Sequence, residues 1–363
     1  MCHRRTSLRC FKRQGNGVAN KIGGDETMLC NGYGGLSRAI AGLTAVLCIL
    51  HLSEGATTAT NWQQLKLAFR KPHVIYRPVP LWWWDGEPLE RERIGWQLGQ
   101  LKSQGVMQVC VIYLTPNAGV PPYFSEDWWR IFTWMVKRAS KLGMRVWFYD
   151  QIGFGGAGWH QRVRKLHPEF RGLMLNKVES DARGSEVTLV MPEGAEFISA
   201  YAYPVIGGIL DVQRAINLSD KIQNGRLHWR APDGEWKVML FYATDSGLMD
   251  TTNRYATRAL IRMLYGEYER RLKRYIGSTI VGSFQDELVL WRFPPWSREF
   301  IQEFKRRHGY DIRPFIAALY HDIGAMTEKV RCEYWDTIIA LTEDAFFKPI
   351  FAWHEQRNLL ISH

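Results

Sequence analysis

Strand-like and helix-like patterns of apolar residues alternate along the middle of this chain. Short apolar runs with the composition of buried strands occupy residues 74–84, 106–114, 144–150 and 278–284. Segments with apolar residues at helical spacing lie between or after them, at residues 87–103, 125–142, 255–275, 297–307 and 328–357. Short connections between alternating strands and helices are typical of parallel βα units. The pattern predicts four strand–helix units, and residues 361–363 resemble the beginning of a fifth strand.

This alternation is interrupted between residues 170 and 243. The segment contains runs with a period of two, such as 186–190 and 237–242, and turn dipeptides at Asn224-Gly225 and Asp233-Gly234. Such a pattern predicts an inserted antiparallel β module, a small sandwich. The predicted fold class is therefore α/β, a partial (β/α)8 TIM-type barrel with an inserted antiparallel module. Residues 57–169 form its first part with three βα units, residues 170–243 the insertion, and residues 244–363 the continued and truncated barrel.

Residues 1–56 have the pattern of a leader. Arg38 precedes an apolar run at 39–50, and the small residues Ser53 and Gly55 suit cleavage near position 55. The run is shorter than a stable membrane span requires, and Met28 is an alternative start. We therefore expect a signal peptide and a secreted or periplasmic protein. Four of the six cysteines fall in this leader, which argues against a disulfide framework or a zinc site in the rest of the chain.

The positive charge of the chain does not indicate a nucleic-acid partner. The formal net charge is +11, but residues 1–38 alone contribute +5, and the rest is spread along helices. The content of 16 tryptophans is more informative, because flat apolar rings stack well on sugar rings. Core packing explains any single tryptophan better, but the clusters at 82–84 and 128–129 exceed what a core of this size usually needs. A carbohydrate is therefore the expected partner, and the pattern says nothing of the oligomeric state.

Four carboxylates follow predicted strands: Asp85, Asp150, Asp286 and Glu287. In a barrel the carboxyl ends of the strands meet at one rim, where active sites lie. Hydrolysis of a glycosidic bond requires one carboxylic acid as proton donor and a second carboxylate as base or nucleophile. A purely structural interpretation stays open, in which Asp286 caps a helix and Glu287 is a solvated loop residue.

Glu287 is the predicted proton donor. Phe284 before it and Trp291 after it would shield its carboxyl group from water and raise its pKa. Asp286 is expected to orient a sugar hydroxyl or a neighbouring side chain. The predicted substrate-binding residues are Trp83, Trp84, Asp85, Asp150, Gln151, Trp159, Trp291 and His363.

The chain contains an ordered set of motifs that includes WWWDG at 82–86, FSEDWW at 124–129, VWFYDQIGFGGAGW at 146–159, SFQDEL at 283–288 and RRHGYDIRPF at 306–315. Together these motifs resemble glycoside hydrolase family 106, the α-L-rhamnosidase-like family. The resemblance covers most of residues 74–363. It implies a distorted barrel with appended β domains and inverting hydrolysis of α-L-rhamnosides. No cofactor is assigned from the residues, although the resemblance implies a calcium ion as in some members.

The family's FxDE segment maps onto residues 284–287, so the resemblance also implies that Glu287 is a catalytic carboxylate. Gln151 stands where the family pattern has Glu, which keeps hydrogen-bonding capacity but loses a charge. Family members continue well beyond the point that corresponds to His363, and the second catalytic carboxylate is expected there. Two functions remain: a glycosidase acting on a terminal deoxysugar, or a truncated, inactive carbohydrate-binding relative.

Overall fold

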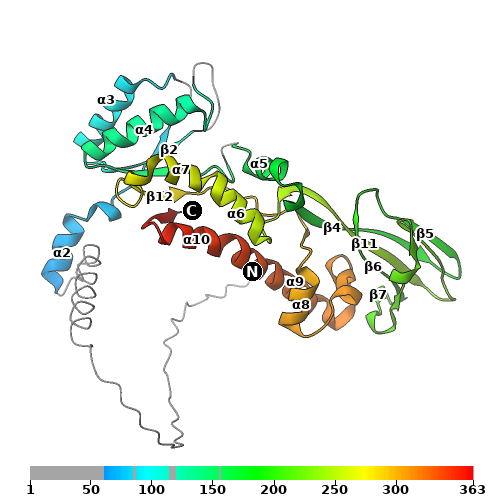
Figure 1. Cartoon of the computed structure of the whole chain (residues 1–363). Helices are drawn as coiled ribbons and strands as arrows, with labels where there is room; N and C mark the ends of the chain where they lie inside the picture. The colour runs from blue at the N-terminus through cyan, green and yellow to red at the C-terminus, as the bar shows by residue number, and fades with distance from the viewer. Residues whose placement is uncertain (1–60, 85–86, 114–119, 155–156, 363) are drawn as a thin grey trace, which may run out of the picture. The chain divides into compact units, whose positions relative to one another are not determined.

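The computed structural model describes residues 61–84, 87–113, 120–154 and 157–362 (Figure 1). The predicted leader, Asp85 and His363 lie outside these residues. The chain divides into two units, Met1–Lys71 and Pro72–His363. In the first, helix α2 (Trp62–Arg70) begins at Asn61, whose side chain accepts a hydrogen bond from the backbone N–H of Gln64. All elements below belong to the second unit.

A five-stranded parallel sheet forms the first half of this unit. Its order is β1-β2-β3-β12-β14, and every neighbouring pair is parallel. The strands are β1 (Leu81–Trp83), β2 (Gln108–Ile112), β3 (Arg145–Tyr149), β12 (Ile280–Phe284) and β14 (Leu360–Ser362). The predicted alternation of parallel strands and helices is confirmed. Among the described residues β1 and β14 are the two edges of an open sheet, so no closed barrel is seen.

Strand alternation explains the two layers of this sheet. Val146 and Phe148 of β3 pack into the main core with the helices, whereas Trp147 and Tyr149 belong to a smaller cluster on the opposite face. The helices are α3 (Arg91–Ser103), α4 (Glu126–Lys141), α5 (Trp159–Leu166), α6 (Arg254–Met263), α7 (Tyr265–Leu272) and α10 (Lys348–Glu355). Each large apolar side chain fully buried here contributes about 1.5–3 kcal/mol.

The start of α4 follows directly from its sequence. The side chain of Ser125 accepts a hydrogen bond from the backbone N–H of Trp128 at 3.2 Å. Glu126 and Asp127 lie in the first turn, where their negative charges interact favourably with the helix dipole. The predicted N-cap is confirmed. It places Trp128 against Phe132, with stacked rings 4.7 Å apart.

The predicted strand at residues 74–84 is only partly formed. Val74–Tyr76 is a 3₁₀ turn, and pairing begins at Leu81. Pro78 and Pro80 lack backbone N–H groups, so this stretch cannot supply a full ladder of hydrogen bonds to β2. The carbonyl oxygens of Val74 and Arg77 instead accept hydrogen bonds from the side-chain amide of Gln108 in β2.

Two antiparallel sheets make up the β module. One has the order β13-β4-β11-β6-β7, with β8 also paired to β6, and the other has the order β5-β10-β9. The strands are β4 (Arg171–Ala182), β5 (Glu186–Val190), β6 (Glu196–Ile206), β7 (Ile209–Leu210), β8 (Ile216–Asn217), β9 (Ile222–Gln223), β10 (Arg226–Arg230), β11 (Trp236–Met249) and β13 (Pro295–Trp296). Leu189, Leu227 and Leu240 share one core, so the two sheets pack face to face as the sequence predicts.

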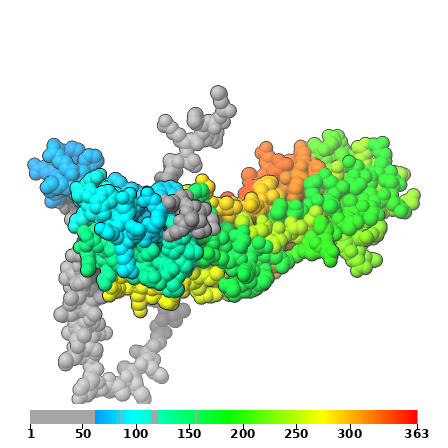
Figure 2. Space-filling model, turned by 90° about the horizontal axis from the view of Figure 1, so that it is seen from above, coloured from blue at the N-terminus to red at the C-terminus, as the bar shows by residue number. Residues whose placement is uncertain are grey.

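The larger sheet is buried on its second face as well. There Leu175 and Met239 share a core with Phe304, Ile316 and further residues of the chain after β12. This segment contains α8 (Phe300–His308), the 3₁₀ helix η6 (Arg313–Leu319) and α9 (Thr327–Thr342). In Figure 2 its orange atoms adjoin the green atoms of the β module without a break. Strand β13, outside the predicted insertion, also pairs with β4.

No helix in the described ranges is both long and apolar enough to cross a membrane.

His160 on α5 is a buried histidine with a defined tautomer. Its Nδ1 accepts a hydrogen bond from the backbone N–H of Met249 at 3.3 Å, so the proton of the neutral ring lies on Nε2. Nε2 has no partner among the described residues. Burial, and secondarily the charge of Arg164, lowers the pKa of His160 to about 4. Protonation is therefore favoured more in the unfolded chain than in the folded one.

This difference predicts a loss of stability on acidification. Between about pH 6.5 and pH 4 the unfolded state binds the extra proton, so the free energy of unfolding falls as the pH is lowered. By pH 5 the loss from this one group is about 2 kcal/mol. Urea unfolding at pH 7 and pH 5 measures it. The variant His160→Asn retains a hydrogen-bond acceptor near the position of Nδ1. In this variant the difference in the free energy of unfolding between pH 7 and pH 5 should be smaller by that amount. The exposed His228, replaced by Asn, is the control and should leave the difference unchanged.

Candidate functional site

The two acids at the end of β12 lie where the sequence predicts them, at the carboxyl rim of the parallel sheet. The side chain of Asp286 is half-buried and that of Glu287 is exposed, so the prediction that Phe284 and Trp291 shield the Glu287 carboxyl group from water is wrong. The backbone of Glu287 is left-handed, with φ 48°. A non-glycine residue adopts this conformation only where the surrounding structure requires it.

A close contact with the loop after β3 supplies that requirement. The backbone N–H of Phe154 donates to the carbonyl oxygen of Asp286 at 3.0 Å. Beside it, Gly153 comes so near that a Cβ atom would lie 2.1 Å from the Asp286 oxygen and 2.4 Å from that of Glu287. Only glycine fits at this point. The contact fixes the two acidic strand ends relative to each other.

Tyr149, the last residue of β3, lies among the carboxylates of this rim. Its hydroxyl donates to the carbonyl oxygen of Phe154 at 2.9 Å. Burial raises the pKa of Tyr149, and the nearby charges of Asp286, Asp150 and Glu287 raise it further. Tyr149 therefore remains protonated and serves as a hydrogen-bond donor that holds the loop.

Asp150 is completely buried and anchors the rim to the helices. One carboxylate oxygen accepts from the hydroxyl of Tyr265 at 2.9 Å, and the other accepts from the backbone N–H of Ile152 at 3.1 Å. Its backbone carbonyl accepts from Nε1 of Trp159 at 2.9 Å. The amide of Gln285 donates to the Tyr265 hydroxyl at 3.1 Å, which joins the β12 end to the same network. This geometry suits a positioning role for Asp150.

Gln151 differs from its neighbours because its amide is unsatisfied. The side chain is buried, the backbone is left-handed with φ 57°, and Nε2 has no hydrogen-bond partner within the described part of the chain. A buried donor without a partner costs about 1–3 kcal/mol. Trp159, on α5, is also buried, with the guanidinium of Arg162 over its ring.

The remaining predicted residues do not join this cluster. Trp83 is exposed at the end of β1, whereas Trp84 is buried in the core against Phe132. Trp291 lies against Trp335 and donates its indole N–H to Thr342 at 3.0 Å. The structure thus brings together Asp150, Gln151, Trp159, Asp286 and Glu287, and it places the three other described tryptophans in different surroundings.

Tyr149, Gly153, Tyr265 and Gln285 are site residues that sequence reasoning missed. Gln285 lies inside the recognised acidic motif and could have been included. Tyr265 is the first residue of α7, within the helical segment predicted at 255–275, and no local signal marks its role. Gly153 lies inside the motif at 146–159, where nothing singles it out.

A second buried polar pair connects β12 to α10. The hydroxyl of Ser283 and Nε2 of His354 are 2.8 Å apart, and Nδ1 of His354 lies 2.8 Å from the carbonyl oxygen of Ile350. Because Nδ1 must donate to that carbonyl, Nε2 accepts from Ser283. Burial lowers the pKa of His354, which keeps the ring neutral. Both side chains are shielded from solvent, so the pair ties β12 to α10.

The residues of the site do not assemble a cation site on their own. In the described ranges no group of three or more His, Cys, Asp or Glu side chains is placed to hold a metal ion. Calcium takes six to eight oxygen ligands, and the Asp150 carboxylate is already engaged by Tyr265 and Ile152. The calcium ion implied by the resemblance therefore does not fit these residues alone.

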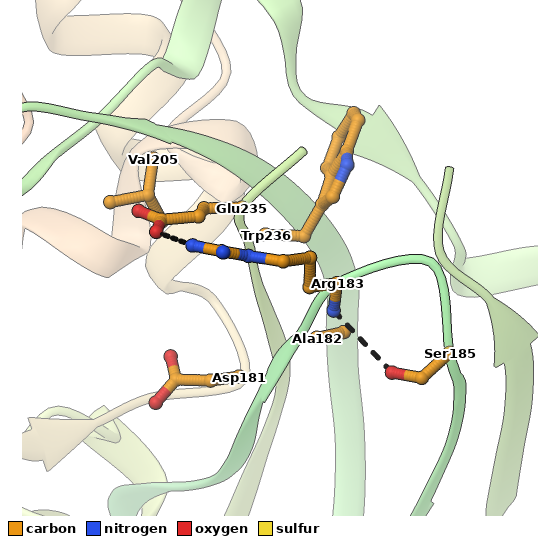
Figure 3. A pocket seen from close by; sticks show the side chains of 7 residues that line it. All are labelled: Asp181, Ala182, Arg183, Ser185, Val205, Glu235 and Trp236. Carbon is orange, nitrogen blue, oxygen red and sulfur yellow. Dashed lines mark hydrogen bonds and ion pairs between the residues drawn. The ribbon is translucent and has the colours of Figure 1, made fainter. Parts of the chain in front are cut away.

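A separate hollow of about 480 Å³ lies in the β module (Figure 3). Its lining consists of Asp181, Ala182, Arg183, Ser185, Val205, Glu235 and Trp236. Arg183 reaches across it to form an ion pair with Glu235, and the Trp236 ring points away from this pair in Figure 3. None of the predicted sugar-binding residues lines this hollow, so it does not belong to the strand-end site.

Comparison with known proteins finds a family model that matches part of this chain. The model of glycoside hydrolase family 106, described as α-L-rhamnosidase, matches residues 202–361. A protein of Formosa agariphila named "Putative beta-glucuronidase" is 21% identical over 334 residues, covering 76% of this chain and 28% of the relative. A rhamnosidase structure from Novosphingobium sp. PP1Y matches with a TM-score of 0.63 and 14% identity.

The structural match covers 82% of this chain and 46% of the rhamnosidase, so the chain spans less than half of that protein. It spans 28% of the relative from Formosa agariphila. At this identity the structural match shows the shared fold. The family match includes β12, the two acids after it and α10 with His354, which are the elements that build the rim. Residues 202–361, less than half of the chain, therefore match glycoside hydrolase family 106, the family of α-L-rhamnosidases.

Proposed function

We propose that this chain is a glycosidase of the α-L-rhamnosidase type, which hydrolyses a terminal deoxysugar with Glu287 as proton donor. The observation that carries the proposal is the acidic end of β12, in the family-matched region, held at the carboxyl rim of a parallel sheet by the close contact with Gly153. Active sites of barrel enzymes lie at this rim. We further propose that the open sheet is the first part of such a barrel, and that the protein is exported.

The two acids have different surroundings, which suits different roles. Glu287 has an exposed side chain that can reach a glycosidic oxygen, whereas the half-buried Asp286 is better placed to accept from a sugar hydroxyl. Asp150 and Tyr149 hold the loop on which this arrangement depends. A general acid protonates the leaving oxygen as the bond to the anomeric carbon breaks, and an inverting enzyme needs a second carboxylate about 6.5–9.5 Å away to activate water. We assign that second carboxylate to no described residue.

A second function remains a candidate: a carbohydrate-binding relative without turnover. Gln151 favours it, because this buried position carries an uncharged amide where the resemblance implies a glutamate. In this case the rim would still bind a sugar through Asp286 and exposed Trp83.

Replacement of Glu287 by Gln tests the proposed proton donor. Gln keeps the shape of the side chain but cannot donate a proton to the leaving oxygen, so release of rhamnose from an alkyl α-L-rhamnoside should fall by about 10²–10⁴-fold. The control is Glu193→Gln at an exposed position of the β module, which should retain full activity. Equal rates for wild type and Glu287→Gln would exclude this role. Binding of L-rhamnose by an inactive wild-type chain would support the alternative.

Replacement of Gly153 by Ala tests the contact between the two strand ends. A methyl group 2.1 Å from a backbone oxygen forces the loops apart, and such overpacking typically costs about 1–3 kcal/mol. We expect a lower free energy of unfolding in urea and, in an active protein, a lower kcat. The matched control is Gly99→Ala within α3, where a Cβ would meet nothing within 4 Å and helix propensity predicts a gain of about 0.5–1 kcal/mol. Equal stability of Gly153→Ala and wild type would contradict the contact.

A further inference from the structure

A groove lies between α3 and α4, which pack side by side (Figure 1). Its volume of about 540 Å³ falls within the range of roughly 300–1,000 Å³ that is usual for ligand sites. No residue of the strand-end site lines it, so it is a separate feature of the protein surface. We call it the α3–α4 groove.

Two tryptophans line the α3–α4 groove, one from each helix. Trp96 on α3 is 57% exposed, and Trp134 on α4 is half-buried. The Trp134 ring lies against the backbone of α3, because a Cβ atom added at Gly95 would be 3.2 Å from its Cη2 atom. Glycine in a helix interior is less stable than alanine, and at this position it makes room for the ring. Neither indole N–H has a hydrogen-bond partner among the described residues, so both can donate to a ligand.

Four cations give the groove a net positive charge, because Glu92 is the single carboxylate among its described lining residues. Within the described ranges none of the four forms an ion pair, whereas Arg130, also on α4, pairs with Asp127 at 2.8 Å. Their charge is therefore available to an anionic ligand. The four cations are Arg91 from α3, and Lys137, Arg138 and Lys141 from α4.

Helix stability explains only part of this charge. Arg138 and Lys141 lie in the last turn of α4, where cations interact favourably with the helix dipole. Arg91 is the first residue of α3, where a positive charge is opposed by the dipole. Its guanidinium lies 6.0 Å from the centre of the Trp134 ring. The groove thus places a cation beside a flat apolar ring, at a position that the helix itself does not favour.

We propose that the α3–α4 groove binds an acidic polysaccharide, one whose sugar rings carry carboxylates. The apolar face of a sugar ring stacks on the exposed indole of Trp96 or on Trp134. The carboxylate of that sugar or of its neighbour is bound by the cations, and the fork of Arg91 matches its two oxygens. The indole N–H groups donate to sugar hydroxyls, and Glu92 accepts from them.

Single-stranded nucleic acid has a related chemistry, because bases also stack on aromatic rings in cationic grooves. The carboxylate of Glu92 favours the polysaccharide. A sugar chain offers hydroxyl donors along its whole length, which satisfy this acceptor, whereas a DNA backbone offers phosphates that it repels. The exposed Glu90, directly before α3, adds a second negative charge at this end of the helix.

Isothermal titration of the full chain with an oligogalacturonate, at about 0.15 M salt, tests the proposal. We expect binding, and binding about tenfold weaker for the methyl ester of the same oligomer, which keeps the rings and loses the charges. Trp96→Ala should weaken binding by about tenfold and Arg91→Gln by about fivefold. The controls are Phe351→Ala, at a position of nearly equal exposure on α10, and Arg226→Gln, exposed on β10. Both should bind as the wild type does, and circular dichroism melting of each variant shows that the fold is kept.

Three results would overturn the proposal: no binding of the oligogalacturonate, equal binding of its methyl ester, or binding that neither groove variant weakens. Oligodeoxythymidine bound more tightly than the oligogalacturonate, and weakened by Trp96→Ala, would assign the groove to single-stranded nucleic acid instead. The outcome is separable from the proposed glycosidase activity, because binding is measured without turnover. A chain that binds the oligomer but releases no rhamnose would keep this proposal and contradict the glycosidase, and a chain that releases rhamnose without binding the oligomer would do the reverse.

Discussion

At the carboxyl ends of β3 and β12, two loop backbones pass so closely that a side chain at position 153 would overlap the carbonyl oxygens of Asp286 and Glu287. The rest of the rim depends on this approach. At this contact the backbone N–H of Phe154 donates to the carbonyl oxygen of Asp286. The next residue, Glu287, has a left-handed backbone conformation. Because a strained conformation persists only when its surroundings enforce it, the position of the exposed acid is determined by a residue without a side chain.

The buried polar groups beneath this contact act as a single support. Asp150 is bound by Tyr265 and by its own loop, Gln285 reaches the same Tyr265 hydroxyl, and Ser283 is bound to His354. Ser283 and Gln285, two residues apart at the end of β12, are thus tied to α10 and α7 respectively. Such networks are stabilising when every member is satisfied, and the unpartnered amide of Gln151 marks the one place in the cluster where a donor remains available.

Local signals predicted the parts of the fold that depend on local chemistry. The cap at Ser125, the strand at β2 and the turn at Asn224-Gly225 were each visible in a few consecutive residues. The strand predicted at 74–84 is longer than the observed β1. The apolar run suggested a full strand, but Pro78 and Pro80 have no backbone N–H to donate to a neighbouring strand.

The site was predictable only where its residues lie in the motif. Asp286 and Glu287 end an apolar strand, and that pattern identified them. Tyr265 meets Asp150 across 115 residues of sequence, and no periodicity reports such a contact. The surroundings of Trp291 depend in the same way on α9, which only the tertiary structure places beside it.

The larger sheet of the β module has a consequence for the order in which the chain acquires its structure. One face of β4 and β11 is covered by strands within the insertion, but the other is covered by α8, η6 and α9, which are more than 50 residues further along the chain. During synthesis the apolar surface that includes Leu175 and Met239 must therefore wait, uncovered, until Phe304 and Ile316 have left the ribosome. The insertion is continuous in sequence but completes its core only together with the helices that follow β12.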